Sequence, residues 1–345
     1  MLADVRKLLS PGRLGVAGLV LVAVVSGILL LVPVGGTYIF LPNEPHAVGP
    51  LVTVEGERRR SDGGGIYYLD VIVRRPSLLE RIFPGVREGS SLVPEEAVNP
   101  TGVSETARRQ GSRREMTRSQ SVAAAVALRE LGYKVIARPV GALISDVVPD
   151  APAAGKLQPT DIVVAVDGAK VLTPGDLRRL LRRVEPGRAV TLTVRRGATT
   201  LRVKLVTVAD PREPGRPVIG VIPDQAADIR LPIEVEIDTG NVGGPSAGLA
   251  FALDVLEELG RDVDRGYKVA VTGAIELDGS VVPVGGVRQK TIGARGGDID
   301  VFLVPAGGNA EEAKRNAGSD LRVIPVQNFR QALRELATLP ERPAD

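Results

Sequence analysis

Ser246 lies in the short run Gly243-Gly244-Pro245-Ser246-Ala247-Gly248. Before this run, residues 233–238 alternate between apolar and acidic side chains, which is typical of a strand with one buried face. After it, apolar residues recur at steps of three and four up to Gly260, which predicts an amphipathic helix with a glycine stop. Ser246 is therefore expected on a tight turn at a helix N-terminus, where free amides can stabilise an oxyanion. A plain Gly-Pro turn with Ser246 as the helix N-cap fits the same pattern.

A nucleophilic serine needs a base, and the composition leaves few candidates. The chain has no cysteine and a single histidine, His46, so a cysteine nucleophile is excluded and a zinc site is disfavoured. Eight of the 44 basic residues are lysines, and the others are arginines, which cannot act as bases near neutral pH, so the base that remains is a lysine or a carboxylate such as Asp238 or Glu276. Lys290 follows Gly285-Gly286 at the start of a predicted short helix. A desolvated lysine can serve as a general base, whereas an ordinary surface lysine is the alternative interpretation.

Several segments in order resemble the proteolytic domain of Lon proteases. The Ser246 turn is followed by the apolar strand 269–273, the segment 275–286 and then Lys290. Order and spacing match over about a hundred residues, which is more specific than one short motif. The resemblance implies that Ser246 is the nucleophile, that Lys290 is its general base and that Thr272 orients the lysine.

The resemblance also bears on the nucleophile loop. We expect the oxyanion donors to be amides near Ala247 and the preceding Gly243 and Gly244. Many Lon enzymes carry an acidic residue two positions before the proline of the turn, where this chain has Gly243. This departure predicts a different resting conformation of the loop. No metal site is expected.

A second module, residues 133–208, precedes this region. Strands are predicted at 143–148, 162–166, 189–195 and 200–206, with a helix at 174–184. The runs 141–149, 151–162 and 164–168 resemble a bacterial PDZ domain. PDZ domains bind peptide C-termini by strand addition, so the resemblance implies a peptide-binding loop at Val140, Gly141 and Ala142. A role as a spacer or assembly module is the alternative.

The N-terminal region has the pattern of a membrane anchor. Residues 14–43 contain no charge, and the apolar run 16–34 is long enough to cross a hydrocarbon core of roughly 30 Å. Arg6, Lys7 and Arg13 precede it. The positive-inside rule therefore predicts a cytoplasmic segment at 1–13, a single-pass transmembrane signal anchor at 14–36 and an extracytoplasmic remainder. A cleaved signal peptide and a buried core helix are the alternatives.

The remaining segments complete an α+β fold class. Residues 45–132 are expected to form the first part of a split Lon-like domain, with a hairpin of strands at 51–56 and 66–73, an irregular charged stretch at 79–116 and a helix at 117–131. Residues 217–339 alternate strands and helices and form the α/β proteolytic part. The expected architecture is a transmembrane helix, a small β-barrel-like PDZ sandwich with helices, and this C-terminal domain.

Composition narrows the class of function. The net charge is +3 with both signs interspersed, and aromatic residues make up 3% of the chain, which argues against nucleic-acid binding. The sequence contains no Gly-x-x-x-x-Gly-Lys-[Ser/Thr] phosphate loop, so no nucleotide or other cofactor is expected. We expect a membrane-anchored, ATP-independent serine endopeptidase that cleaves extracytoplasmic proteins selected by the PDZ module, with peptides and proteins as partners. A catalytically inactive membrane-anchored PDZ scaffold is the alternative. A homo-oligomer is implied by the resemblance alone, since Lon-like domains often assemble as rings.

Overall fold

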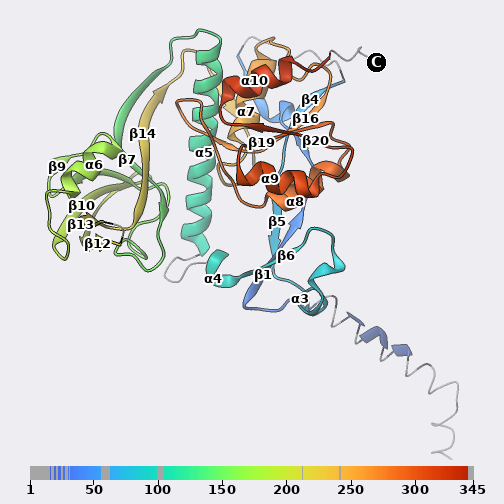
Figure 1. Cartoon of the computed structure of the whole chain (residues 1–345), viewed down its shortest axis with the longest axis horizontal. Helices are drawn as coiled ribbons and strands as arrows, with labels where there is room; N and C mark the ends of the chain where they lie inside the picture. The colour runs from blue at the N-terminus through green and yellow to red at the C-terminus, as the bar shows by residue number, and fades with distance from the viewer. Residues whose placement is uncertain are drawn as a thin grey trace, which may run out of the picture.

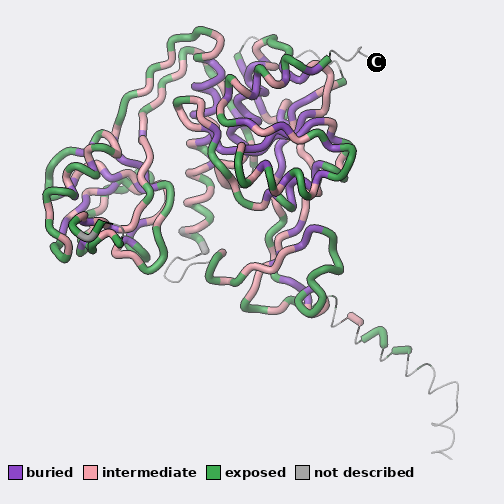
Figure 2. The backbone as a smooth tube through the Cα atoms, in the orientation of Figure 1, coloured by how far each residue is buried: buried purple, intermediate pink, exposed green. Residues whose placement is uncertain are grey.

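The computed structural model describes residues 32–340 apart from 56–62, 99–104, 212 and 241, together with scattered residues between 16 and 30. A long helix, α5 (Glu105–Glu130), runs between two bodies (Figure 1). One body is a small β-rich module, which we define as residues 136–230, and the other is a large domain built on a mixed sheet. Buried segments concentrate inside the large domain and along the inner strands of the small module (Figure 2). The predicted mixture of α and β structure is confirmed.

The central sheet of the large domain has five strands in the order β2-β4-β16-β19-β20. Four of them are parallel, and β2 is antiparallel to β4. The side chains of Val271 and Leu303 enter one core, whereas those of Ala270 and Phe302 enter a second core on the opposite face. Because both faces are buried, these strands are continuous apolar runs in the sequence. The strands are β2 (His46–Ala47), β4 (Gly65–Tyr68), β16 (Lys268–Val271), β19 (Val301–Pro305) and β20 (Arg322–Val326).

Helices cover both faces of this sheet. They are α7 (Gly248–Glu258), α8 (Val287–Gly296), α9 (Gly308–Asn316) and α10 (Phe329–Ala337). Leu253 of α7 and Leu333 of α10 belong to the first core, and Ala294 of α8 and Ala313 of α9 belong to the second. Helix α5 packs against α7 and contributes Val122 to the first core. The predicted alternation of strands and helices after Lys290 is thus confirmed.

The stretch 79–116 is more regular than the sequence predicts. Ser77 and Glu80 form a capping box that starts α3, and Glu80 also accepts hydrogen bonds from Arg74 and Arg87. Helix α5 begins at Glu105, well before the predicted start at residue 117. The sequence did not reveal these first turns, because they are polar and carry no apolar periodicity. The elements here are α3 (Leu78–Ile82), η2 (Pro84–Val86), β6 (Ser91–Pro94) and α4 (Glu95–Val98), and β6 joins β1 (Thr37–Pro42) and β5 (Val71–Arg74) in an antiparallel sheet.

The hairpin expected between residues 51–56 and 66–73 does not form within the described part of the chain. After the short η1 (Gly49–Leu51), strand β3 (Val52–Val54) pairs with β15 (Val235–Ile237). Strand β4 pairs instead with β2 and, in parallel, with β16. Each predicted strand therefore finds a partner distant in sequence, and both pairings join the N-terminal segment to the large domain.

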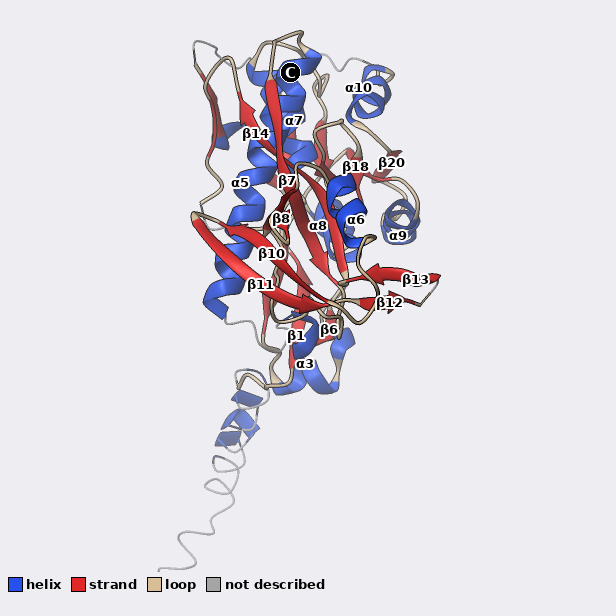
Figure 3. Ribbon diagram, turned by 90° about the vertical axis from the view of Figure 1, so that its left-hand side faces the viewer, coloured by secondary structure: helices blue, strands red, loops and turns tan. Residues whose placement is uncertain are grey.

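The main sheet of the small module has the order β11-β10-β8-β7-β14, with β9 paired to β8, and β12 and β13 form a separate two-stranded sheet. The module has its own core around Ile144 and Leu192. Figure 3 shows β8, β10 and β11 side by side, with α6 next to them. Thr173 and Asp176 form the capping box that starts α6. The elements are β7 (Ile136–Val147), β8 (Ile162–Val166), β9 (Ala169–Lys170), α6 (Pro174–Leu181), β10 (Ala189–Arg196), β11 (Thr199–Val206), β12 (Val208–Asp210), β13 (Glu213–Val218) and β14 (Val221–Arg230).

Strands β7 and β14 form an antiparallel ribbon that enters and leaves the small module. Their register runs from Val147 opposite Val221 to Ile136 opposite Arg230. The chain enters the module along β7, soon after the end of α5, and returns along β14 (Figure 1). Among the described residues β14 and β11 are the two edge strands of this sheet. The ribbon therefore places the two connections to the large domain side by side.

The structure corrects the expected peptide-binding loop at Val140, Gly141 and Ala142. These residues lie inside β7, where Gly141 is opposite Ala226 and Ala142 pairs on its other side with Val163 of β8. A Cβ atom at Gly141 would lie 2.5 Å from Ile162 Cγ2, and the residue has a φ of 154°. Close packing between β7 and β8 therefore requires a glycine at position 141. A glycine in a sequence motif is equally consistent with a loop, so the sequence alone could not distinguish the two.

The predicted transmembrane segment 14–36 lies largely outside the described residues. Within the described part of the chain, no helix combines the length and apolar character that a membrane span requires. Val34 donates a backbone hydrogen bond to Pro76, which attaches the end of this segment to the small sheet of β1, β5 and β6.

Candidate active site

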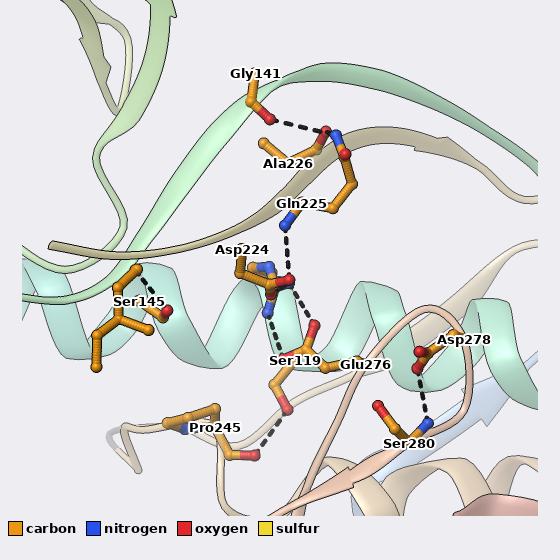
Figure 4. Close-up of polar contacts among 12 residues, drawn as sticks. Ser119, Gly141, Ser145, Asp224, Gln225, Ala226, Pro245, Glu276, Asp278 and Ser280 are labelled. Carbon is orange, nitrogen blue, oxygen red and sulfur yellow. Dashed lines mark hydrogen bonds and ion pairs between the residues drawn. The ribbon is translucent and has the colours of Figure 1, made fainter. Parts of the chain in front are cut away.

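The turn that carries Ser246 is held between α5, α7 and the end of β16. Gly244 N donates to the carbonyl of Ser112, and Ser119 Oγ donates to the carbonyl of Pro245 at 3.1 Å (Figure 4). Gly273 N donates to the carbonyl of Ser246 at 2.9 Å. Ser246 is thereby fixed just before the first residue of α7, as the change of periodicity predicts.

The structure brings Ser246, Thr272 and Lys290 together from three separate elements. Lys290, on α8, places its Nζ 2.9 Å from Ser246 Oγ and 3.0 Å from Thr272 Oγ1. Thr272, at the end of β16, donates its hydroxyl proton to the carbonyl of Ser246 at 3.4 Å. The oxygen of Thr272 is therefore left to accept from Lys290, which orients the amine toward Ser246.

Lys290 is 3% exposed, on a helix that packs against the second core. Burial lowers its pKa to about 8, and the nearby carboxylate of Asp70 acts in the opposite direction. Desolvation disfavours the ammonium because a buried charge loses its hydration. A lysine with this pKa has a substantial neutral fraction at mildly alkaline pH, so its lone pair can accept a proton from the serine hydroxyl.

The expected oxyanion donors are only partly available. The amide of Gly244 is already bonded to Ser112, and a Cβ atom at Gly243 would lie 2.3 Å from Ser112 Oγ. The first turns of α5 therefore occupy the space that an acidic side chain at position 243 would need. The amides of Ser246 and Ala247 donate to no acceptor among the described residues, and they stand at the N-terminus of α7. These two amides are the geometric candidates for binding an oxyanion.

Ser246 opens into a cleft of about 340 Å³ between the large domain and the small module. The large domain supplies Ser246 and Pro245 together with the β17–β18 hairpin, the small module supplies Leu143, Ile144, Ser145 and Thr160, and α5 supplies Glu115 and Arg118. The hairpin strands are β17 (Ala274–Ile275) and β18 (Val281–Val282), and the lining continues through residues 282–285. Residues 233–238, the alternating strand that precedes the Ser246 turn in the sequence, are absent from this lining.

An arginine between two carboxylates joins the small module to the rim of the cleft. Arg118 on α5 donates to Asp224 of β14 and to Glu276 beside β17, both at 2.7 Å. Figure 4 shows Asp224 and Glu276 together alongside α5. Burial raises the pKa of Glu276 to about 7, and Arg118 opposes this shift. Sequence reasoning missed this contact, because the two partners lie 106 and 158 residues from Arg118 and no periodicity connects them.

One cluster of carboxylates outside the cleft has the composition of a cation site. Ligand atoms of Glu257, Asp262 and Asp264 lie within 4.8 Å of one another. However, Glu257 accepts hydrogen bonds from the amides of Val263 and Asp264, and Asp262 accepts one from the amide of Arg265. The cluster is therefore accounted for by the turn that follows α7.

Two protein families match parts of the chain. Residues 224–338 match the Lon protease (S16) C-terminal proteolytic domain, and residues 115–207 match the PDZ domain family. The chain contains a Lon proteolytic domain and a PDZ domain. The predicted ranges 217–339 and 133–208 overlap these matches, and the small module extends beyond the PDZ match because it includes β14.

The matched relatives are Lon proteases. The Lon protease of Vibrio parahaemolyticus is 39% identical over 94 residues, which cover 26% of this chain and 12% of that protein. The Lon protease of Methanosarcina barkeri is 36% identical over 96 residues, and Lon protease 2 of Herpetosiphon aurantiacus is 34% identical over 108 residues. These matches cover 27% and 30% of this chain and 12% and 13% of the respective relatives. The chain thus spans about an eighth of the length of these relatives.

Two of the solved structures similar to part of the chain are PDZ domains. The PDZ domain of the SdrC-like protein from Listeria monocytogenes is 22% identical and covers 24% of this chain and 87% of that chain, with a TM-score of 0.23. The SdrC-like PDZ domain from Listeria innocua is 24% identical and covers 24% of this chain and 92% of that chain, also with a TM-score of 0.23.

Proposed function

We propose that this chain is a serine endopeptidase in which Ser246 is the nucleophile and Lys290 is the general base. The contact of 2.9 Å between Lys290 Nζ and Ser246 Oγ, inside the cleft, carries the proposal. The match to the Lon proteolytic domain supports the same class of reaction. Serine and lysine themselves supply the nucleophile and the proton acceptor, so the proposed reaction requires neither a cofactor nor ATP.

The proposed reaction begins when neutral Lys290 accepts the proton of the Ser246 hydroxyl as the oxygen attacks the peptide carbonyl. The amides of Ser246 and Ala247 stabilise the oxyanion that forms. Lys290 then donates the proton to the leaving amine, which breaks the peptide bond and leaves an acyl-enzyme. A water molecule, deprotonated by Lys290, hydrolyses this ester and releases Ser246. Thr272 keeps the amine directed toward Ser246 throughout these steps.

The test of this assignment is labelling by a serine-reactive fluorophosphonate probe together with cleavage of an unfolded protein without ATP. The wild-type chain should be labelled and active, whereas Ser246→Ala should show neither property. Lys290→Arg should lose at least about a hundredfold in rate, because a guanidinium retains its proton. Absence of labelling in the folded wild-type chain would overturn the proposal and favour the scaffold alternative.

For the location, we propose a single-pass anchor at 14–36 with a cytoplasmic N-terminus and an extracytoplasmic catalytic domain. The supporting observation is the sequence pattern, in which Arg6, Lys7 and Arg13 precede an uncharged stretch. Protease added to intact spheroplasts should then digest the small module. Protection of the module in intact spheroplasts, with digestion after permeabilisation, would contradict this topology.

The small module is proposed to select substrates by strand addition at β14 and not at the predicted loop of residues 140–142. The supporting observation is that β14 is one of the two edge strands of the sheet and carries Asp224, which Arg118 joins to the rim of the cleft, whereas β7 is already paired on both sides at Ala142. An edge strand offers unpaired backbone groups to an extended peptide. A homo-oligomer is proposed from the family resemblance and is tested by light scattering of the purified chain.

A further inference from the structure

Glu115 on α5 lines the cleft that contains Ser246, yet its carboxylate makes no hydrogen bond or ion pair with any described residue. The side chain is half-buried, and burial raises its pKa. Carboxylates removed from water are normally paired, because the charged form loses hydration without compensation. An unpaired carboxylate at this position, within the cleft, is therefore suited to meet a cation that arrives with a ligand.

The neighbouring arginines do not satisfy this carboxylate. Arg118 directs its guanidinium to Asp224 and Glu276, each at 2.7 Å. Arg114 uses its Nε to donate to Thr160 Oγ1 at 2.9 Å, although its charge and that of Arg118 both lower the pKa of Glu115. The charged residues in the lining of the cleft are Glu115, Glu276 and Arg118, and the guanidinium group of Arg118 is already shared between Glu276 and Asp224. Glu115 is therefore the carboxylate of the lining that is left for a basic group of a ligand.

The rest of the lining suits the aliphatic part of a long basic side chain. Leu143 and Ile144 stand on the side of the small module, and Ala274, Val282 and Pro283 stand on the side of the large domain. Lysine and arginine bury their methylene groups against apolar walls and extend the charged end to a polar partner. Ser246 and Glu115 line the same cleft, so a residue close to the scissile bond can reach the carboxylate.

We propose that Glu115 selects substrates that carry a lysine or arginine side chain next to the scissile peptide bond. This inference rests on the proposed peptidase function and adds to it a substrate class. Glu115 binds the basic side chain, while Arg118 holds the two neighbouring carboxylates so that they keep the shape of the cleft. The basic group then supplies the ion pair that Glu115 lacks in the free protein.

The test digests β-casein with the full chain and identifies the cleaved bonds by mass spectrometry. Lysine and arginine should be enriched at one fixed position relative to the cleaved bond, and a matched peptide pair with lysine or norleucine at that position should differ about tenfold in kcat/KM. Glu115→Gln should reduce that ratio to about twofold or less, and Glu115→Lys should reverse it toward acidic residues. Glu311→Gln, on the exposed side of α9, is the matched control and should leave the ratio unchanged.

Two outcomes separate this inference from the proposed function. Cleavage that depends on Ser246 but shows no preference for basic residues, or a preference that Glu115→Gln retains, overturns the inference and leaves the peptidase assignment intact. Absence of both cleavage and probe labelling of Ser246 removes the proposed function and the inference with it. The labelling rate of Glu115→Gln, measured beside its melting temperature, ensures that a lost preference is not caused by misfolding.

Discussion

At the scale of single residues, the burial of Lys290 links activity and stability to pH. Its pKa falls from the ordinary value of 10.5 to about 8 in the folded chain. The proposed mechanism requires a neutral Lys290, so kcat/KM should rise along one ionisation with a midpoint near pH 8. Between pH 8 and about 10.5 the unfolded chain binds more protons at this site than the folded chain, so its contribution to the free energy of unfolding increases with pH. Lys290→Met should abolish activity and remove this increase, as measured by denaturant unfolding at several pH values.

Asp70 should tune the same ionisation from a distance. Its carboxylate accepts a hydrogen bond from Asn43 at 2.7 Å and lies 3.3 Å from His46 Nε2, and its charge raises the pKa of Lys290. Asp70→Asn removes this charge, so the midpoint of the pH–activity profile should move to lower pH. Asp298→Asn, which changes an exposed carboxylate paired with Lys268, is the control. A profile that stays in place for Asp70→Asn would contradict this role.

The resemblance to the Lon proteolytic domain was sufficient to predict which side chains meet Ser246, but not which amides remain free. Ser246, Thr272 and Lys290 lie in the motifs that carry this resemblance, so each could be identified before its neighbours were known. The occupation of the Gly244 amide by Ser112 could not be predicted, because it depends on a helix more than a hundred residues earlier in the chain. The unpaired carboxylate of Glu115 could not be predicted either, because its surroundings also come from residues distant in the sequence.

At the scale of secondary structure, α5 supports the nucleophile through close packing at Gly248. A Cβ atom at this position would lie 2.6 Å from Ser119 Oγ and 3.1 Å from Ile275 Cγ2. Gly248→Ala should therefore cost about 1–3 kcal/mol of stability and lower kcat, because α5, α7 and β17 must separate. Gly111→Ala is the matched control on α5, where the nearest atom is 4.0 Å away, and it should stabilise by about 0.5–1 kcal/mol. Denaturant unfolding of both variants checks the contrast.

Strands and helices with a clear apolar pattern were predicted well, whereas polar helical turns and pairings between strands distant in sequence were not. Strand β8 coincides with a continuous apolar run, and α6 begins at the predicted Pro174. The polar first half of α5 and the pairing of β3 with β15 leave no comparable signal, because both depend on surfaces brought together by the tertiary fold.

At the scale of the whole molecule, the small module is part of the cleft and not only a separate binding unit. The sequence places every catalytic candidate outside residues 133–208, which predicts that short peptides are cleaved without the module. Because Leu143, Ser145 and Thr160 line the cleft, we expect that cleavage of short peptides also requires the module. Removing this wall would expose the cleft to water and leave part of the peptide without contacts.

A bulky residue on this wall tests the arrangement without removing the module. Ser145 is exposed and faces the cleft, so Ser145→Trp should narrow it and reduce kcat/KM for short peptides by about tenfold or more. Thr200→Trp, at an exposed position on β11, is the control and should leave kcat/KM unchanged. Equal activity of the two variants on short peptides would show that the module stands away from the cleft in solution.

The ribbon of β7 and β14 also has a consequence for how the chain folds. Strands β4 and β16 pair in parallel although Gly65 and Lys268 are about 200 residues apart, which is an entropically costly loop to close. Ile136 and Arg230 face each other across the ribbon, so a small module that forms first holds its own two ends together. The loop that remains to be closed is then roughly halved, which saves about 0.6 kcal/mol. A small module that folds early thus holds together the two chain segments that build the large domain, and it shortens the loop that their pairing must close.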